Sequence, residues 1–167
     1  MIRIFKLFIV LIWLSIASPV FSANNYNLII MVPDDHARRA MGAYGDSQVL
    51  TPNLDQLASH GVRFDNAYAA APVCSPSRAA MLSGQYPSQV GISDFLMLNE
   101  NYSNQGMDEN ALIWPQVLQD NGYETGLIGK WHLGELPKYQ PQNRGFNYFV
   151  SYNQDLTPFN PLLNVNG

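Results

Sequence analysis

Three groups of side chains have the types and the spacing that chemistry requires. The first is the adjacent pair Asp34 and Asp35, which directly follows a short apolar run. Ligands of open α/β sheets bind beyond the carboxyl ends of the strands, and two adjacent carboxylates there repel each other unless a cation lies between them. Oxygen ligands favour Ca²⁺ or Mg²⁺ over zinc. The structural alternative is a turn in which one aspartate caps the next segment.

The second group surrounds the single cysteine, Cys74. This residue stands where a helix is expected to begin, with Pro76 in the first turn and Arg78 one turn further on. A helix N-terminus favours negative charge, and Arg78 returns to the same side of the helix, so a thiolate or an oxyanion would be stabilised there. The alternative is an inert buried cysteine beside a surface arginine. A cysteine nucleophile also needs a histidine base, and the nearest candidate is remote in sequence.

The third group is Lys130 and His132, which follow a short strand predicted at residues 125–128. At a spacing of two, their side chains point to the same face of an extended chain. A cation and a proton carrier on one face suit an anionic, tetrahedral group that undergoes transfer. The alternative is a solvated lysine next to a hydrogen-bonded loop histidine.

Alternating strands and helices must position these side chains. An apolar, unalternating run predicts a central strand that is buried on both faces. Thr51 and Pro52 are a typical helix start, with Thr51 as the cap, and Gly61 is a typical helix end. The predicted order is a strand at 27–32, a helix from Thr51 to Gly61, a strand at 62–68, helices at 75–82 and 113–121, and a strand at 125–128. This order predicts an α/β domain with a largely parallel sheet; the pattern fades from Pro137 onward.

Composition excludes several classes of protein. The 167 residues fit about one domain, and 47% of them are hydrophobic, enough to build a core. The formal net charge is −4, so no basic stripe is available and a nucleic-acid partner is not expected. One cysteine cannot form an internal disulfide or a cysteine-based zinc site.

The first 22 residues have the pattern of a secretory signal peptide. Arg3 and Lys6 precede an apolar run at 7–17, and Pro19 and the small residues Ser22 and Ala23 follow it. Cleavage after Ser22 would leave residues 23–167 in a secreted or periplasmic protein. The alternative is a permanent anchor, but the apolar run is short for a span of about 20 residues. We therefore expect no stable membrane span after removal of the signal peptide.

These motifs, taken in order, resemble the N-terminal part of the type I sulfatases, which depend on formylglycine and belong to the alkaline phosphatase-like superfamily. The resemblance covers about residues 27–150. It is carried by Asp34-Asp35, Gly42-Ala43-Tyr44-Gly45, Thr51-Pro52-Asn53-Leu54-Asp55, the first signature from Cys74 to Gly84, the second from Gly122 to Gly134, and Arg144-Gly145-Phe146.

The resemblance implies the chemistry of each site residue. A formylglycine-generating or sulfatase-maturing enzyme would read Cys74, Pro76 and Arg78 and oxidise Cys74 to formylglycine. One hydroxyl of the hydrated aldehyde would attack the sulfur of a sulfate ester, and the second would then expel sulfate. Asp34, Asp35 and the modified Cys74 would ligate Ca²⁺ in preference to Mg²⁺, and Arg78 would support the hydrate. Lys130 and His132 would bind the substrate, with His132 taking a proton.

The resemblance also implies an alkaline phosphatase-like sandwich with a largely parallel central sheet, incomplete at the C-terminus. Family members are usually several times longer, and their remaining metal ligands and leaving-group acid lie downstream. We therefore expect residues 23–167 to be a truncated catalytic domain that is poorly stable alone and weakly active or inactive. The expected substrate is a sulfated carbohydrate or an aryl sulfate. The alternatives are a phosphatase or a phosphonate or phosphodiester hydrolase of the same superfamily, and a non-catalytic secreted fragment.

Overall fold

The computed structural model describes residues 26–97, 104–153 and 163–166. The chain divides into two units, residues 1–33 and 34–167. The predicted signal segment, residues 1–22, lies outside the described residues. No helix in the described ranges is long and apolar enough to cross a bilayer.

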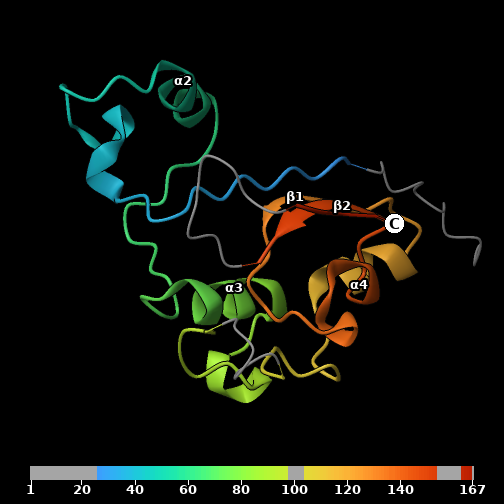
Figure 1. The fold of residues 1–167 in the computed structure, drawn as a ribbon. Coiled ribbons are helices and arrows are strands. Elements are labelled where there is room, and N and C mark those ends of the chain that lie inside the picture. Colours follow the sequence, from blue (N-terminus) through green and yellow to red (C-terminus); the bar gives the residue numbers. More distant parts are fainter. Residues whose placement is uncertain (1–25, 98–103, 154–162, 167) are drawn as a thin grey trace, which may run out of the picture. The chain divides into compact units, whose positions relative to one another are not determined.

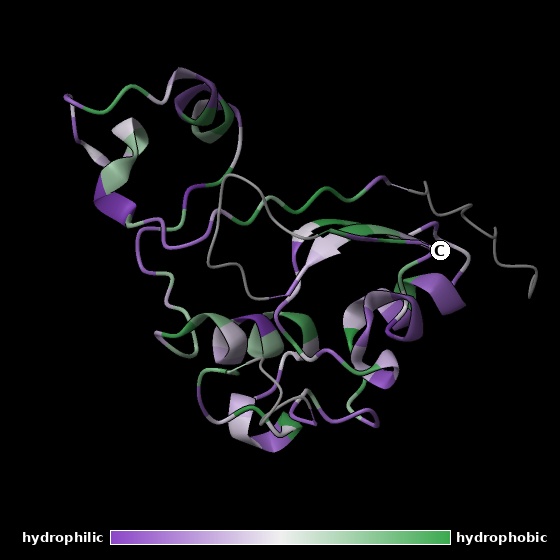
Figure 2. Ribbon diagram, viewed as in Figure 1, coloured by the Kyte–Doolittle hydropathy of each residue, from purple (hydrophilic) through white to green (hydrophobic). Residues whose placement is uncertain are grey.

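The described part of the first unit, residues 26–33, contains neither helix nor strand. Most of it is hydrophobic (Figure 2), yet its side chains are exposed; that of Ile29 is 82% exposed. The prediction of a buried strand at 27–32 is therefore wrong for this structure. An apolar run becomes a strand only where a neighbouring strand pairs with its backbone, and no described strand does so here.

The second unit begins at Asp34, and its described residues form short helical turns, three α-helices and a small sheet (Figure 1). In chain order its elements are η1 (Arg38–Ala40), η2 (Gly42–Tyr44), α2 (Pro52–His60), α3 (Cys74–Ser83), η3 (Pro87–Val90), α4 (Trp114–Asp120), β1 (Gly126–Lys130), η4 (Pro137–Tyr139), η5 (Pro141–Asn143), β2 (Tyr148–Tyr152) and β3 (Asn164–Val165).

The sheet has the order β1-β2-β3. Strands β1 and β2 are parallel, with Gly126 opposite Tyr148 and Lys130 opposite Tyr152. Strand β3 pairs antiparallel with β2. A parallel pair beside helices confirms the predicted α/β class, and β1 confirms the strand predicted at 125–128. The strand predicted at 62–68 is wrong: Val62 and Phe64 are exposed, and this segment has no strand partner among the described residues.

The three α-helices confirm the helices predicted at these places. Helix α3 ends at Gly84, whose φ of 68° is accessible to glycine at little cost. Helix α2 ends before Gly61 as predicted, and Thr51 stands at its N-cap position, but the expected capping hydrogen bond from the Thr51 side chain is not formed. The Thr51 hydroxyl does not cap the helix; it donates to Asp55 and accepts from the backbone N–H of Gly42.

The core lies between α3, α4 and one face of the sheet. It is built from Ala79, Leu82, Val90, Ile92, Leu96, Met107, Ile113, Trp131, Leu133 and Phe146. Within β1, Leu127 packs against this core while Ile128 is 81% exposed on the other face. The buried guanidinium of Arg144 donates to the carbonyls of Glu109 and Ala111, which fixes that loop beside the core.

Candidate active site

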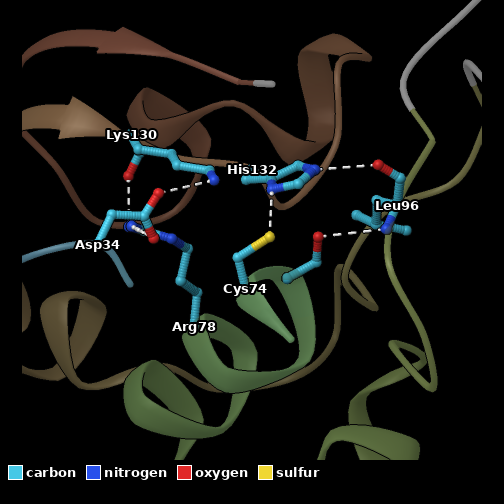
Figure 3. Close-up of polar contacts among 7 residues, drawn as sticks. Asp34, Cys74, Arg78, Leu96, Lys130 and His132 are labelled. Carbon is cyan, nitrogen blue, oxygen red and sulfur yellow. Dashed lines mark hydrogen bonds and ion pairs between the residues drawn. The ribbon is translucent and has the colours of Figure 1, made fainter. Parts of the chain in front are cut away.

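Cys74 is the first residue of α3, and its thiol lies against a histidine (Figure 3). The preceding residue, Val73, is extended, with φ −117° and ψ 145°, so the chain turns into the helix at Cys74. Cys74 Sγ lies 3.3 Å from His132 Nδ1. The two residues are 58 positions apart in the sequence, so the sequence alone did not indicate that His132 lies beside this cysteine.

His132 is fully buried and is held from two further sides. Its Nε2 lies 3.0 Å from the Leu96 carbonyl oxygen, and the edge of the Phe95 ring approaches it at 4.9 Å between centroids. Burial lowers the pKa of His132, and the positive charges of Lys130 and Arg78 act in the same direction. A ring with a lowered pKa is neutral near pH 7 and can accept a proton.

A second set of contacts joins Asp34, Arg78 and Lys130 (Figure 3). Arg78 donates to Asp34 Oδ1 at 3.2 Å, and Lys130 Nζ donates to Asp34 Oδ2 at 2.9 Å. Arg78 also donates to the backbone carbonyl of Lys130 at 2.8 Å. Burial alone would raise the pKa of Asp34, but its hydrogen bonds and ion pairs with Lys130 and Arg78 lower it overall.

The single carboxylate of Asp34 does not neutralise all the positive charge of the cluster. Two cations face one carboxylate, so with a neutral histidine the set has one more positive than negative charge. The Nε of Arg78 is buried and has no hydrogen-bond partner among the residues that the structure describes. An unused donor and an excess of positive charge suit an anionic group.

Two residues of the predicted site have unusual backbones. Asp35 has φ 56° and His132 has φ 57°, and among the described residues they alone have positive φ without being glycine. This left-handed conformation costs on the order of 1 kcal/mol or more, and it persists where surrounding contacts hold it. For His132 those contacts are the ones to Cys74 and Leu96.

The predicted metal ligands do not form a metal site on their own. Asp34 is occupied by two cations, and Asp35 is exposed, with no ion pair or side-chain hydrogen bond to another described residue. Over 26–97, 104–153 and 163–166, no three His, Cys, Asp or Glu side chains gather closely enough to hold a metal. Ca²⁺ takes six to eight oxygens, so these residues do not fit the ion without further ligands.

The structure thus brings together five of the predicted residues: Asp34, Cys74, Arg78, Lys130 and His132. They surround the start of α3 and the carboxyl end of β1 (Figure 3). Pro76 is buried in the first turn of α3.

Sequence reasoning missed three residues around His132, namely Ser75, Phe95 and Leu96. Leu96 acts through its backbone, which any residue type could supply, so no residue pattern could have revealed it.

Comparison with known proteins shows the family to which the chain belongs. The family model described as Sulfatase matches residues 26–163. Human arylsulfatase H is 41% identical over 133 residues, which cover 74% of this chain and 24% of that protein. Human steryl-sulfatase is 37% identical over 137 residues, covering 77% and 24% of the two chains. The chain therefore spans about a quarter of the length of these curated relatives.

Solved structures agree as well. The crystal structure of Ps i-CgsB matches with a TM-score of 0.69 and 38% identity, over 73% of this chain and 27% of that one. The same protein in complex with k-i-k-neocarrahexaose matches with a TM-score of 0.69 and 37% identity, over the same shares of the two chains. The family model spans most of this chain, and the cysteine motif lies beside the end of β1, where Lys130 and His132 stand. The chain therefore belongs to the sulfatase family.

Proposed function

We propose that the protein is a sulfuric ester hydrolase that cleaves sulfate esters through a formylglycine derived from Cys74. One observation carries this proposal: the cysteine of a Cys-x-Pro-x-Arg motif begins α3 and lies 3.3 Å from a buried histidine. Arg78 of the same motif, one turn further along the helix, joins Lys130 and Asp34. A reactive position, a base and two cations are thereby collected in one place.

Each side chain has a role that its contacts support. Formylglycine, once formed, supplies a hydrated aldehyde whose oxygen can attack the sulfur of a sulfate ester. His132 has Nδ1 directed at residue 74, so it is placed to accept a proton from a hydroxyl there. Lys130 and Arg78 provide positive charge for the sulfate group, and both also pair with Asp34.

We propose from the resemblance that the protein requires Ca²⁺. Asp34 and Asp35 would have to release their present contacts or turn toward the ion, and further oxygen ligands would have to join them. Calorimetric titration with Ca²⁺ and with Mg²⁺ tests this directly. Binding of Ca²⁺ that is lost in Asp35→Asn would support the assignment; unchanged binding in that variant would remove Asp35 from the ligand set.

The proposed substrates are sulfated carbohydrates or aryl sulfates. The similar protein Ps i-CgsB was crystallised with a carbohydrate, k-i-k-neocarrahexaose, which favours the first class. The other proposed partner is a formylglycine-generating or sulfatase-maturing enzyme, because Cys74, Pro76 and Arg78 stand at the spacing that this enzyme would read. Secretion or export to the periplasm through residues 1–22 would place the protein where such substrates occur.

A comparison of two esters tests the reaction type. The protein is expressed with a formylglycine-generating enzyme, conversion of Cys74 is measured by mass, and aryl sulfate and aryl phosphate are assayed with Ca²⁺ and with a chelator. A sulfatase turns over the sulfate faster than the phosphate, and only after conversion. Preferred turnover of the phosphate would support the phosphatase or phosphonate and phosphodiester hydrolase alternative; no turnover of either ester by converted protein would support a non-catalytic fragment.

A further inference from the structure

Ser75, between Cys74 and Pro76, is fully buried in the first turn of α3. Its hydroxyl oxygen accepts a hydrogen bond from the backbone N–H of Leu96 at 3.2 Å. The carbonyl of the same Leu96 lies 3.0 Å from His132 Nε2. Leu96 therefore connects Ser75 to the histidine ring through its own two backbone groups. Figure 3 shows the contact between the Leu96 carbonyl and His132.

This connection determines which ring nitrogen of His132 is free. A carbonyl oxygen can only accept a hydrogen bond, so Nε2 must carry the proton in its contact with Leu96. In the neutral ring Nδ1 is then the acceptor, and Nδ1 is the atom that faces Cys74 Sγ. The edge-on contact with Phe95 restricts rotation of the ring.

Removal of the Ser75 hydroxyl would leave the Leu96 N–H without its partner at a buried position. A buried donor without an acceptor is unfavourable, so the loop would move to find another partner. The Leu96 carbonyl would move with its own residue, and His132 would lose the group that selects its tautomer. The position of Nδ1 relative to residue 74 would then no longer be fixed.

We propose that Ser75 is a positioning residue: through Leu96 it holds His132 as the Nε2-protonated tautomer, with Nδ1 directed at residue 74. The effect on turnover rests on the proposed sulfatase function. The state of the ring does not, because the contacts already exist with the unmodified thiol of Cys74.

The first test observes the ring without any catalysis. The protein is expressed without a maturing enzyme and with ¹⁵N-labelled histidine, and ring nitrogen spectra are recorded near pH 8, above the ordinary histidine pKa of about 6.5. The chain has three histidines, so His36→Gln and His60→Gln variants assign the signals of His132. The parent is expected to show the Nε2-protonated tautomer, and Ser75→Ala a mixture of both tautomers.

Two matched variants complete this test. Ser75→Thr keeps the hydroxyl and is expected to restore the spectrum of the parent. Ser83→Ala removes a hydroxyl from the far end of the same helix, where it donates to the Ala79 carbonyl, and is expected to leave His132 unchanged. Identical His132 signals in Ser75→Ala and the parent would overturn the proposal.

The second test uses protein converted at Cys74, with rates expressed per converted site. We expect Ser75→Ala to lower kcat about tenfold, because a misplaced proton acceptor loses part of its contribution to the rate. KM for an aryl sulfate should stay within about twofold, since Lys130 and Arg78 are untouched. Equal kcat in the two proteins, or a change in KM alone, would contradict a positioning role.

Folding is controlled separately. If circular dichroism shows that Ser75→Ala does not fold, Ser75→Cys replaces it, because its thiol has a similar shape but is only a weak acceptor. The same spectral and kinetic criteria then apply. A changed tautomer in the variant keeps the role of Ser75 whether or not the parent turns over an ester. A converted parent that turns over an aryl sulfate, beside an unchanged tautomer in the variant, would keep the proposed function and reject the role of Ser75.

Discussion

The three consecutive residues 130–132 alternate between the candidate site and the core: Lys130 and His132 lie in the site, and Trp131 lies in the core. Lys130 ends β1 and reaches Asp34, whereas Trp131 is 2% exposed and donates from its indole to the Tyr139 carbonyl. His132 then takes a positive φ and turns toward Cys74. Lys130 and His132 both reach the cluster, but not along the extended chain that the prediction assumed. The positive φ of His132 turns the backbone after β1, and the residue pattern did not predict this turn.

Replacement of Lys130 by methionine tests its proposed contact with sulfate. Loss of a positioned cation should lower turnover of an aryl sulfate by roughly 10²-fold or more. The stability should change by less than about 1 kcal/mol, because the partner carboxylate of Asp34 is about half exposed and keeps its ion pair with Arg78. Steady-state kinetics and urea unfolding measure the two effects.

The matched control is Lys138→Met. Lys138 is also a lysine near an acidic side chain, with Nζ 3.8 Å from Glu109, but it lies outside the cluster. Its turnover should stay within about twofold of the parent. If Lys130→Met and Lys138→Met have the same turnover, Lys130 has no special role in substrate binding.

At the scale of elements, residues at the helix ends predicted the helices correctly, whereas the pairing of strands far apart in the sequence was not predicted. Proline in the first turn and glycine after the last act within one segment, and α2, α3 and α4 form where those signals stand. Strand β2 was not predicted, although Tyr148–Tyr152 is aromatic and β-branched, because it follows a proline-rich stretch. The segments 27–32 and 62–68, wrongly predicted as strands, have the apolar residues of a strand but pair with none of the described strands.

Alanine substitutions at Gly122 and Gly145 distinguish the cost of backbone strain from the cost of steric overlap, because the two glycines have nearly equal φ. Gly122 has φ 81° and open space where a Cβ would stand, whereas Gly145 has φ 83° and a Cβ there would overlap the backbone of Gln116 in α4. Gly122→Ala should therefore lower the free energy of unfolding by about 1 kcal/mol. Gly145→Ala should lower it by at least about 2 kcal/mol more, because α4 must shift.

Urea or thermal unfolding of the two variants under the same conditions measures this difference. Both substitutions add the same methyl group, so composition cannot explain a gap between them. Equal stability losses would show that α4 gives way without cost and that the close approach at Gly145 does not hold it in place.

At the scale of the whole molecule, the site depends on segments that are far apart in the chain. Asp34, the start of α3 and the end of β1 meet only after folding, with Asp34 and Lys130 separated by 96 positions. The motifs predicted the residues of the site, and the structure brings five of them together. Asp35 stays outside the cluster: its carboxylate is exposed and makes no ion pair or side-chain hydrogen bond with the described residues. The pairing of Cys74 with His132 required the fold.

The N-terminal segment yields a prediction at the same scale. We expect export of the protein with cleavage after Ser22, because a basic start and an apolar run precede small residues there. N-terminal sequencing of the exported protein should begin at Ala23 or one residue later. Replacement of Ser22 by a bulky residue such as Phe should block or move the cut. Retention of Met1 in the exported, membrane-free protein would contradict the signal peptide.

The central claim is that the reaction resides in the modified side chain of Cys74. The most direct measurement is the turnover of an aryl sulfate by Cys74→Ala, co-expressed with a formylglycine-generating enzyme, beside a parent whose conversion is confirmed by mass. Because Cys74 is half-buried at the start of α3, the variant should keep the circular dichroism spectrum of the parent and lose essentially all turnover. Measurable turnover by Cys74→Ala, equal to that of the converted parent, would contradict the account.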